Sequence, residues 1–288
     1  MSQKMQLAIQ GGGAKIALLI AAMEAVEELQ ESGVLEVTRI AGTSAGSIVG
    51  CLFAAGISMK TVRNRLRDGL GERLLRAYRA PSVGKVIRQA TPFIGGSPFW
   101  DETHLRTFLA EFFENPDIKL NELNKPMIVM SANITDLRAF SHKDDDYVIS
   151  AITNSCGLPF CFRTWSRGGG PVLVDGGICE NLPTEVLEKN ADQYGPIAAI
   201  SFEQQVSYAP RDVIGFTKAL LDTAINNSIT RAKGALPPNS VYPIKTSLST
   251  FDFHKALTTG LNEEYKAVRL EASNWFRKFA ERNQNLGL

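Results

Sequence analysis

The chain has 288 residues, of which 44% are hydrophobic, and its formal net charge is +1. This length allows one large α/β domain or two small ones, and the hydrophobic fraction is ordinary for a protein with a sizeable core. The near-neutral charge predicts no strong attraction to a nucleic-acid polymer, which excludes the strongly basic binding classes.

The first half of the chain predicts alternating strands and helices. The expected elements are a buried strand Met5–Gln10, a helix Ile16–Ser32 that ends at Gly33, a strand Val37–Ala41 and a buried apolar helix Ser47–Ala55. The helix Ile16–Ser32 carries Glu24, Glu27, Glu28 and Glu31 on the face opposite its apolar residues. This strand–loop–helix–strand–turn–helix order favours a mainly parallel sheet with helices on both faces.

The second half continues the pattern with shorter elements. The expected strands are Met127–Ile134, Tyr147–Ile152, Leu173–Val174 and Ile197–Phe202, and the expected helices are Thr184–Asn190 and an amphipathic Leu257–Arg282. No repeat or clear linker interrupts the chain. We therefore expect residues 1–288 to form a single α/β domain, with the motifs in 7–183 and the part 184–288 completing the fold.

Two neighbouring segments differ from the rest in composition. The run from Lys60 to Arg88 holds nine basic residues against Asp68 and Glu72. It is either a solvated helical face or a dock for anionic lipid headgroups or a phosphorylated regulatory ligand. The loop Pro92–Trp100 that follows carries three aromatic residues. Its apolar side chains belong to the core, to a subunit contact that makes a homo-oligomer, or to a lid that touches the membrane.

No segment predicts secretion or membrane insertion. The start of the chain does not resemble a signal peptide, and the longest apolar stretch, Ile16–Val26, is too short to span a bilayer. The four cysteines, Cys51, Cys156, Cys161 and Cys179, show no Cys-x-x-Cys spacing. We expect reduced thiols and a cytoplasmic location, with peripheral association with the inner membrane when the protein is active.

The run Gly42-Thr43-Ser44-Ala45-Gly46 lies between a predicted strand and a predicted helix. A Gly-x-Ser-x-Gly sequence in this setting is typical of a nucleophile elbow. A serine hydroxyl needs a base beside it, most often histidine. None of His104, His142 and His254 stands in a convincing motif, and His142 precedes three aspartates in what we expect to be a solvated hairpin tip rather than a calcium site.

An aspartate can accept the serine proton directly. Asp175 follows the apolar run Val172-Leu173-Val174 and precedes two glycines, which leave room around its carboxylate. Attack on an ester also needs donors for the oxyanion. The backbone N–H groups of Gly11, Gly12 and Gly13 suit this role, and the run lacks the pattern of a phosphate-binding loop, Gly-x-x-x-x-Gly-Lys-Ser/Thr.

Together these motifs resemble those of the patatin-like phospholipase family. The matching stretches are Gly11–Lys15, Gly42–Gly46, Ser155–Phe160 and Asp175–Pro183. The resemblance implies a three-layer α/β fold, a dyad of Ser44 and Asp175, and an oxyanion hole at Gly11, Gly12 and Gly13. Lys15 stands where the family usually has Arg or Lys and is expected to support the site, and Ile16 replaces a common glycine without removing an amide donor.

The expected activity is hydrolysis of fatty-acyl esters in phospholipids or related lipids through an acyl-serine intermediate, without a cofactor or metal. Leu158, Phe160 and Phe162 are expected to line the acyl groove, with a purely structural wall as the alternative. The rival functions are a lysophospholipase, a neutral-lipid lipase or an acyltransferase with the same dyad, and a catalytically silent lipid-binding scaffold. The resemblance also includes bacterial effectors that a cyclic nucleotide activates in phage defence, so a gated enzyme is a further expectation.

Overall fold

The structure is a computed structural model that describes residues 2–70, 102–158, 170–189, 191–203, 213–248 and 263–285. The strands are β1 (Gln3–Ile9), β2 (Leu35–Thr43), β3 (Met127–Asn133), β4 (Arg138–Ser141), β5 (Leu173–Asp175), β6 (Ile197–Phe202) and β7 (Val241–Ile244). The α-helices are α1 (Ile16–Glu31), α2 (Ala45–Ala54), α3 (Met59–Arg65), α7 (Glu102–Ala110), α8 (Val148–Ser155), α9 (Gly177–Glu180), α10 (Glu185–Glu188), α11 (Ala191–Tyr194), α12 (Val213–Ala235) and α14 (Glu263–Asn285). Shorter helical turns are η1 (Gly13–Lys15), η2 (Leu66–Leu70) and η3 (Leu120–Glu122).

The sheet is mainly parallel, which confirms the predicted fold class. Its strand order is β4-β3-β2-β1-β6-β7, and β5 pairs with β3 beside this path. β1, β2, β3, β6 and β7 are joined by parallel pairings, whereas β4 and β5 run antiparallel to β3. The carboxyl ends of the five parallel strands therefore meet at one edge of the sheet, the carboxyl edge.

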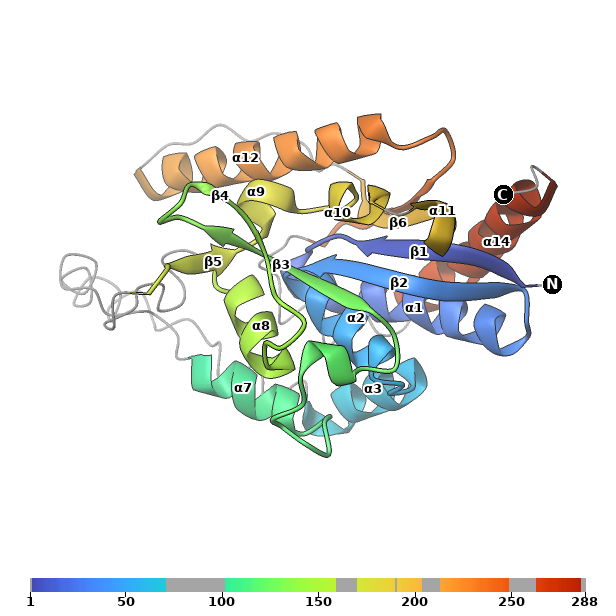
Figure 1. Cartoon of the computed structure of the whole chain (residues 1–288), viewed down its shortest axis with the longest axis horizontal. Coiled ribbons are helices and arrows are strands. Elements are labelled where there is room, and N and C mark those ends of the chain that lie inside the picture. Colours follow the sequence, from blue (N-terminus) through green and yellow to red (C-terminus); the bar gives the residue numbers. More distant parts are fainter. Residues whose placement is uncertain are drawn as a thin grey trace.

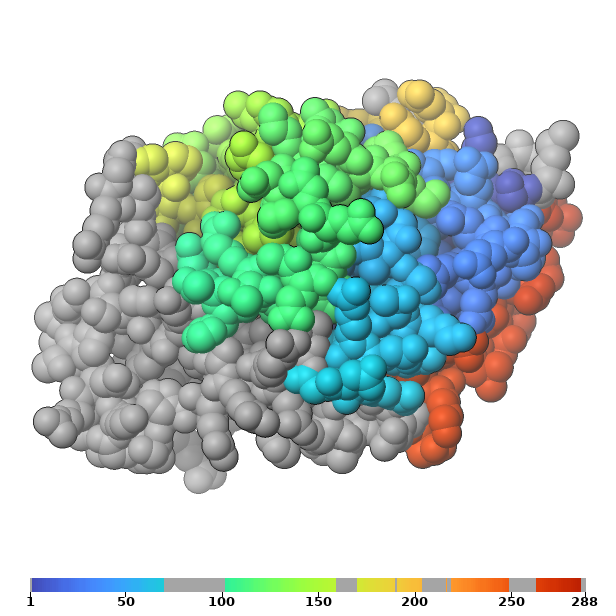
Figure 2. Space-filling model, turned by 90° about the horizontal axis from the view of Figure 1, so that it is seen from below, coloured from blue at the N-terminus to red at the C-terminus, as the bar shows by residue number. Residues whose placement is uncertain are grey.

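Helices cover both faces of the sheet (Figure 1). The steps from β1 to β2 and from β6 to β7 go in opposite directions across the sheet, so right-handed crossovers place α1 and α12 on opposite faces. α1 packs against α2, α3 and α14, while α9 packs against α12 and β3. From below, α3 in cyan lies between the green residues that begin with α7 and the red α14 (Figure 2).

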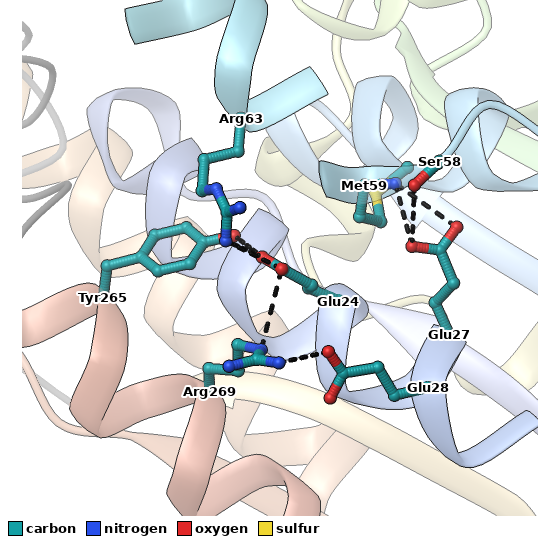
Figure 3. A network of polar contacts seen from close by, with 8 residues as sticks. All are labelled: Glu24, Glu27, Glu28, Ser58, Met59, Arg63, Tyr265 and Arg269. Carbon is teal, nitrogen blue, oxygen red and sulfur yellow. Dashed lines mark hydrogen bonds and ion pairs between the residues drawn. The ribbon is translucent and has the colours of Figure 1, made fainter. Parts of the chain in front are cut away.

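A buried carboxylate joins α1, α3 and α14, the helices that pack together on one face of the sheet (Figure 3). Glu24 of α1 lies 2.7 Å from the Arg63 guanidinium of α3 and accepts a 2.5 Å hydrogen bond from the Tyr265 hydroxyl of α14. Arg269 of α14 approaches the same carboxylate at 3.7 Å and pairs with Glu28. The prediction that Glu24 lies on a polar outer face is therefore wrong, because its charge is matched inside the layer.

Most predicted elements are confirmed, with one error and several omissions. The structure contains the strands predicted around Met5–Gln10, Val37–Ala41, Met127–Ile134, Leu173–Val174 and Ile197–Phe202. It also contains the helices predicted at Ile16–Ser32, Ser47–Ala55 and Thr184–Asn190, and the described part of the one predicted at Leu257–Arg282. Gly33 has a φ of 72° after α1. The strand predicted for Tyr147–Ile152 is wrong, because this β-branched run forms α8 and buries Val148, Ile149 and Ile152 on one side. β4, β7 and α12 were not predicted.

Candidate active site

Ser44 lies on a strained turn between β2 and α2. Its φ of 52° and ψ of −125° fall in a region that non-glycine residues rarely occupy. The turn packs tightly, since a Cβ added to Gly42 would lie 2.6 Å from the Gly46 carbonyl oxygen, and one added to Gly46 would lie 2.3 Å from that of Ile9. Both glycines are therefore needed for the close approach that places the serine at the carboxyl edge.

The pairing of β3 brings Asp175 beside Ser44. Thr43, the last residue of β2, pairs with Met130, and the next residue of β3, Ser131, pairs with Asp175 at the end of β5. β5 thus continues the line of β2 along β3. The Ser44 hydroxyl donates a 2.7 Å hydrogen bond to Asp175 Oδ2, and the Gly177 N–H donates to Oδ1 at 2.8 Å.

Burial changes the acidity of this aspartate. Asp175 is 3% exposed, and the loss of water raises the pKa of its carboxyl from 3.8 to about 6, although the hydrogen bonds from Ser44 and Gly177 act in the opposite direction. The carboxylate is still mostly ionised at neutral pH. It also binds a proton more readily than a solvated aspartate, which suits a general base.

Ser155 of α8 fixes the elbow from behind, and sequence reasoning assigned it no role. The Ser44 N–H donates to Ser155 Oγ at 2.8 Å, and this hydroxyl donates to the Met130 carbonyl at 2.5 Å. The strained main chain of Ser44 is thereby tied to β3. The neighbouring thiol of Cys156 is free and buried, and burial together with the Asp175 charge raises its pKa above the ordinary range.

The glycine run follows β1 and lies against the elbow. A Cβ on Gly11 would lie 3.1 Å from Ser44 Cβ. The Gly11 N–H already donates to the Asn181 carbonyl at 3.0 Å. Gly12 and Gly13 donate no amide hydrogen bond to a described residue, and Gly13 turns the chain with a φ of 52°. The Gly11 N–H is therefore already engaged, and a donor role for Gly12 and Gly13 stays a prediction.

Lys15, which was expected to support the site, is buried. Its ammonium lies 4.5 Å from the centre of the Phe202 ring at the end of β6. Burial lowers the pKa of Lys15 to about 8, and the nearby Asp222 carboxylate opposes this shift. Leu158, a predicted groove residue, is half-buried just after α8. Phe160 and Phe162 lie outside the described residues.

The turn Glu180–Asn181 connects the site to α12, and sequence reasoning did not find this connection. The Thr43 hydroxyl donates to the Glu180 carbonyl at 2.7 Å, and the Asn181 N–H donates to Ser228 Oγ at 3.1 Å. With the Gly11–Asn181 bond, this turn holds the elbow, the glycine run and α12 together. The sequence signal was the stretch Asp175–Pro183, whose asparagine received no role.

His142 is buried, so the predicted solvated hairpin tip is wrong at this residue. Its Nε2 lies 3.0 Å from Ser131 Oγ, and its Nδ1 lies 2.9 Å from Asp146 Oδ2. This Ser–His–Asp arrangement resembles a catalytic triad in its distances. Ser131 is 1% exposed and lies on an extended strand, without the sharp turn and converging amides that a nucleophile needs. Burial lowers the pKa of His142, which favours the neutral ring.

Of the other two histidines, only His104 lies among the described residues. His104 is exposed on α7 and makes none of the hydrogen bonds described at the Ser44 turn. His254 and Cys161 lie outside the described residues. Among the described residues, no group of three or more His, Cys, Asp or Glu side chains is arranged to hold a metal ion. None of the described helices is both long enough and apolar enough to cross a bilayer.

Comparison of the sequence with known proteins gives the family that the motifs resemble, and comparison of the structure gives a related fold. A family model described as patatin-like phospholipase matches residues 7–188. The YqhO protein of Bacillus subtilis is 24% identical over 216 residues, which cover 70% of this chain and 72% of that protein. The mouse patatin-like phospholipase domain-containing protein 6 is 30% identical over 184 residues, which cover 62% of this chain but only 12% of that protein.

Two further comparisons complete this picture. The lysophospholipase NTE1 of Cryptococcus neoformans is 27% identical over 202 residues, which cover 65% of this chain and 10% of that protein. The crystal structure of VipD from Legionella pneumophila superposes with a TM-score of 0.55 at 15% identity, covering 98% of this chain and 67% of VipD. At this identity the likeness to VipD concerns the fold alone.

Proposed function

Because the chain belongs to the patatin-like phospholipase family, we propose that it hydrolyses fatty-acyl ester bonds of phospholipids or related lipids, with Ser44 as nucleophile and Asp175 as base. The observation that carries this proposal is the 2.7 Å hydrogen bond from Ser44 Oγ to Asp175 Oδ2. It joins a serine on a strained elbow to a carboxylate whose burial raises its pKa to about 6.

The reaction follows from this geometry in two balanced halves. As Ser44 Oγ attacks the acyl carbonyl carbon, its proton passes to Asp175, and the carbonyl oxygen becomes an oxyanion. We assign the donors for this oxyanion to the Gly12 and Gly13 amides, and their lack of a hydrogen bond to any described residue supports this assignment. Asp175 returns the proton to the leaving alcohol oxygen, which leaves Ser44 acylated. Water then repeats the sequence and releases the fatty acid.

A serine-directed probe tests the nucleophile against the alternative trio at His142. A fluorophosphonate should label the wild-type protein and Ser131→Ala, but not Ser44→Ala. Turnover of a phospholipid should be abolished in Ser44→Ala and in Asp175→Asn. Labelling that persists in Ser44→Ala and disappears in Ser131→Ala would refute the proposed dyad. The same probe tests a silent lipid-binding scaffold, which would not be labelled at all.

We also propose that the carboxyl edge touches the lipid surface. Large exposed hydrophobic side chains flank this edge: Ile134 and Leu137 in the turn after β3, and Phe216 and Leu220 in the first half of α12. α12 connects the parallel strands β6 and β7, so its first half lies at the carboxyl edge near the site (Figure 1). A lipid that enters an edge lined in this way keeps its acyl chains out of water.

Vesicle binding tests this contact. The double variant Leu137→Ser, Phe216→Ser should sediment less with phosphatidylglycerol–phosphatidylethanolamine vesicles than the wild type, by about tenfold in apparent affinity. The control is Leu270→Ser, which changes an exposed leucine on α14, the helix that packs against α1 on the face of the sheet opposite α12. Equal binding by all three proteins would rule out this surface.

Analysis of the reaction products distinguishes the alternative lipid-hydrolase activities. Release of a free fatty acid from diacyl or from monoacyl phospholipids separates a phospholipase from a lysophospholipase, and transfer to an added alcohol identifies an acyltransferase. A cyclic-nucleotide gate in phage defence remains a prediction. In the described part of the basic run, Arg63 pairs with Glu24 and Arg65 bonds to the Glu111 carbonyl. Residues 71–88 and the aromatic loop Pro92–Trp100 lie outside the described residues. Liposome hydrolysis with and without cyclic nucleotides tests the gate.

A further inference from the structure

The side chain of Asn181 is polar, mostly buried and without a hydrogen-bond partner among the described residues. Asn181 is 5% exposed. Its main chain is fully engaged, since the carbonyl accepts from Gly11 and the N–H donates to Ser228. Its carboxamide, by contrast, makes no hydrogen bond to any described residue. Neither of its polar atoms is among the fully buried, unpartnered side-chain atoms of the described residues, which are Arg63 Nε and Arg269 Nε, so the carboxamide keeps access to solvent beside the dyad and is free to bond to a bound substrate.

The position of this carboxamide is defined by the glycines around it. A Cβ on Gly11 would lie 2.4 Å from Asn181 Oδ1, and one on Gly177 would lie 2.9 Å from the same atom. The added Cβ of Gly11 would also lie 3.1 Å from Ser44 Cβ. The two Gly11 distances together place the end of the Asn181 side chain at most about 5.5 Å from Ser44 Cβ. It therefore lies between the glycine run and the loop that carries the base.

The chemistry of the site gives this amide a role. The Gly11 N–H, the first amide of the glycine run, is used up by the Asn181 carbonyl. A carboxamide offers two N–H donors, and rotation about its last bond places its nitrogen where its oxygen lies. The carboxamide is uncharged, so it can lie close to the Asp175 carboxylate without electrostatic repulsion while it donates to a developing oxyanion.

We infer that Asn181 is a further catalytic residue, whose Nδ2–H donates to the acyl carbonyl oxygen as that oxygen gains charge. This inference rests on the proposed Ser44 chemistry. The side chain takes the donor place that Gly11 leaves, beside the Gly12 and Gly13 amides. No covalent step involves Asn181, and its hydrogen bond strengthens as the tetrahedral intermediate forms. The Gly11–Asn181 main-chain bond sets the distance between this donor and the elbow.

Kinetics with a shape-matched variant test the inference. Asn181→Leu keeps the volume and removes the donors. On a soluble short-chain ester, kcat should fall by about 10²- to 10³-fold, while KM changes by less than about threefold, because the donor acts mainly in the transition state. Asn227→Leu makes the same substitution at an exposed position of α12 and should leave both constants unchanged.

A thionoester distinguishes a donor from a packing residue. Sulfur accepts hydrogen bonds more weakly than oxygen, so the wild-type protein should prefer the oxygen ester, and this preference should shrink about tenfold in Asn181→Leu. If Asn181→Leu fails to fold, Asn181→Ser, with a shorter side chain that cannot reach, should show the same loss. A wild-type kcat, or a lower kcat with an unchanged oxygen-to-sulfur preference, overturns the inference. Wild-type turnover by Ser44→Ala would instead overturn the proposed function.

Discussion

Replacement of Asp175 by asparagine should stabilise the protein at neutral pH while it abolishes activity. Burial raises the pKa of Asp175 from 3.8 to about 6, so the folded protein binds this proton more tightly than the unfolded chain. A raised carboxyl pKa means that stability falls as pH rises from about 3.8 through about 6. The ionised carboxylate therefore costs stability at pH 8, and asparagine removes this cost.

The size of the effect follows from the shift. A difference of this size between folded and unfolded pKa is worth about 3 kcal/mol at full ionisation. Part of this ionisation cost is already present at pH 4. The stability of Asp175→Asn relative to the wild type should therefore rise by about 2 to 3 kcal/mol between pH 4 and pH 8. Most of this rise should occur below pH 6, where the unfolded carboxyl is ionised and the folded one is not.

Urea unfolding of both proteins at pH 4, 6 and 8 measures this difference. The matched control is Asp145→Asn, in which the carboxylate is exposed to water. Its stability difference from the wild type should stay flat across the same range. A flat difference for Asp175→Asn as well would refute the reasoning, since the buried carboxylate would then cost nothing to ionise.

Further outcomes are expected for the pH profile of activity, for two glycines and for two glutamates. With a soluble ester, kcat should rise with pH along an acid limb near pH 6, because Asp175 must be ionised to accept the proton; activity that is constant down to pH 4.5 would contradict this. Gly46→Ala should lower the free energy of unfolding by about 3 kcal/mol or more, since its Cβ would meet main-chain oxygen of Ile9 at 2.3 Å. In contrast, Gly234→Ala in α12 meets nothing and should stabilise by about 0.5 to 1 kcal/mol, as denaturant titration can verify. Glu24→Ala should cost about 3 kcal/mol, because it leaves Arg63 without its buried partner, whereas Glu28→Ala, at a half-exposed pair, should cost less than about 1 kcal/mol. Equal losses for the two glutamates would show that burial does not set the strength of this network.

The parts of the fold that the sequence predicts are those in which local pattern and final burial agree. β1, β2, β3 and β6 each hold several apolar residues and are buried along most of their length, so pattern and structure coincide. β7 contains Pro243 and β4 has only exposed or half-buried residues, and the two strands lie at opposite ends of the described sheet, where such residues are tolerated. The neighbouring strands β3 and β6 hold β4 and β7 in an extended conformation, and the local sequence of β4 and β7 does not reveal these neighbours.

The same distinction separates the predicted from the unpredicted parts of the site. Ser44 and Asp175 were predicted from glycine-flanked motifs, because the chain must turn sharply there. Ser155, Asn181 and Ser228 act through contacts between segments far apart in the sequence, and serine or asparagine in a helix or turn is too common to stand out. His142 was misjudged for the converse reason. Its polar neighbours in sequence are exposed, while Ser131 and Asp146 enclose its ring.

The long-range bonds around the Glu180–Asn181 turn also bear on how this protein is made. Thr43 and Gly11 come early in the chain, whereas the turn that fixes both of them, and the Ser228 hydroxyl that fixes the turn, come much later. On the proposed mechanism, a ribosome-bound chain that has emerged only as far as α8 holds the nucleophile Ser44 without its base Asp175. The serine would then stay unreactive until β5 and the Glu180–Asn181 turn join the earlier segments.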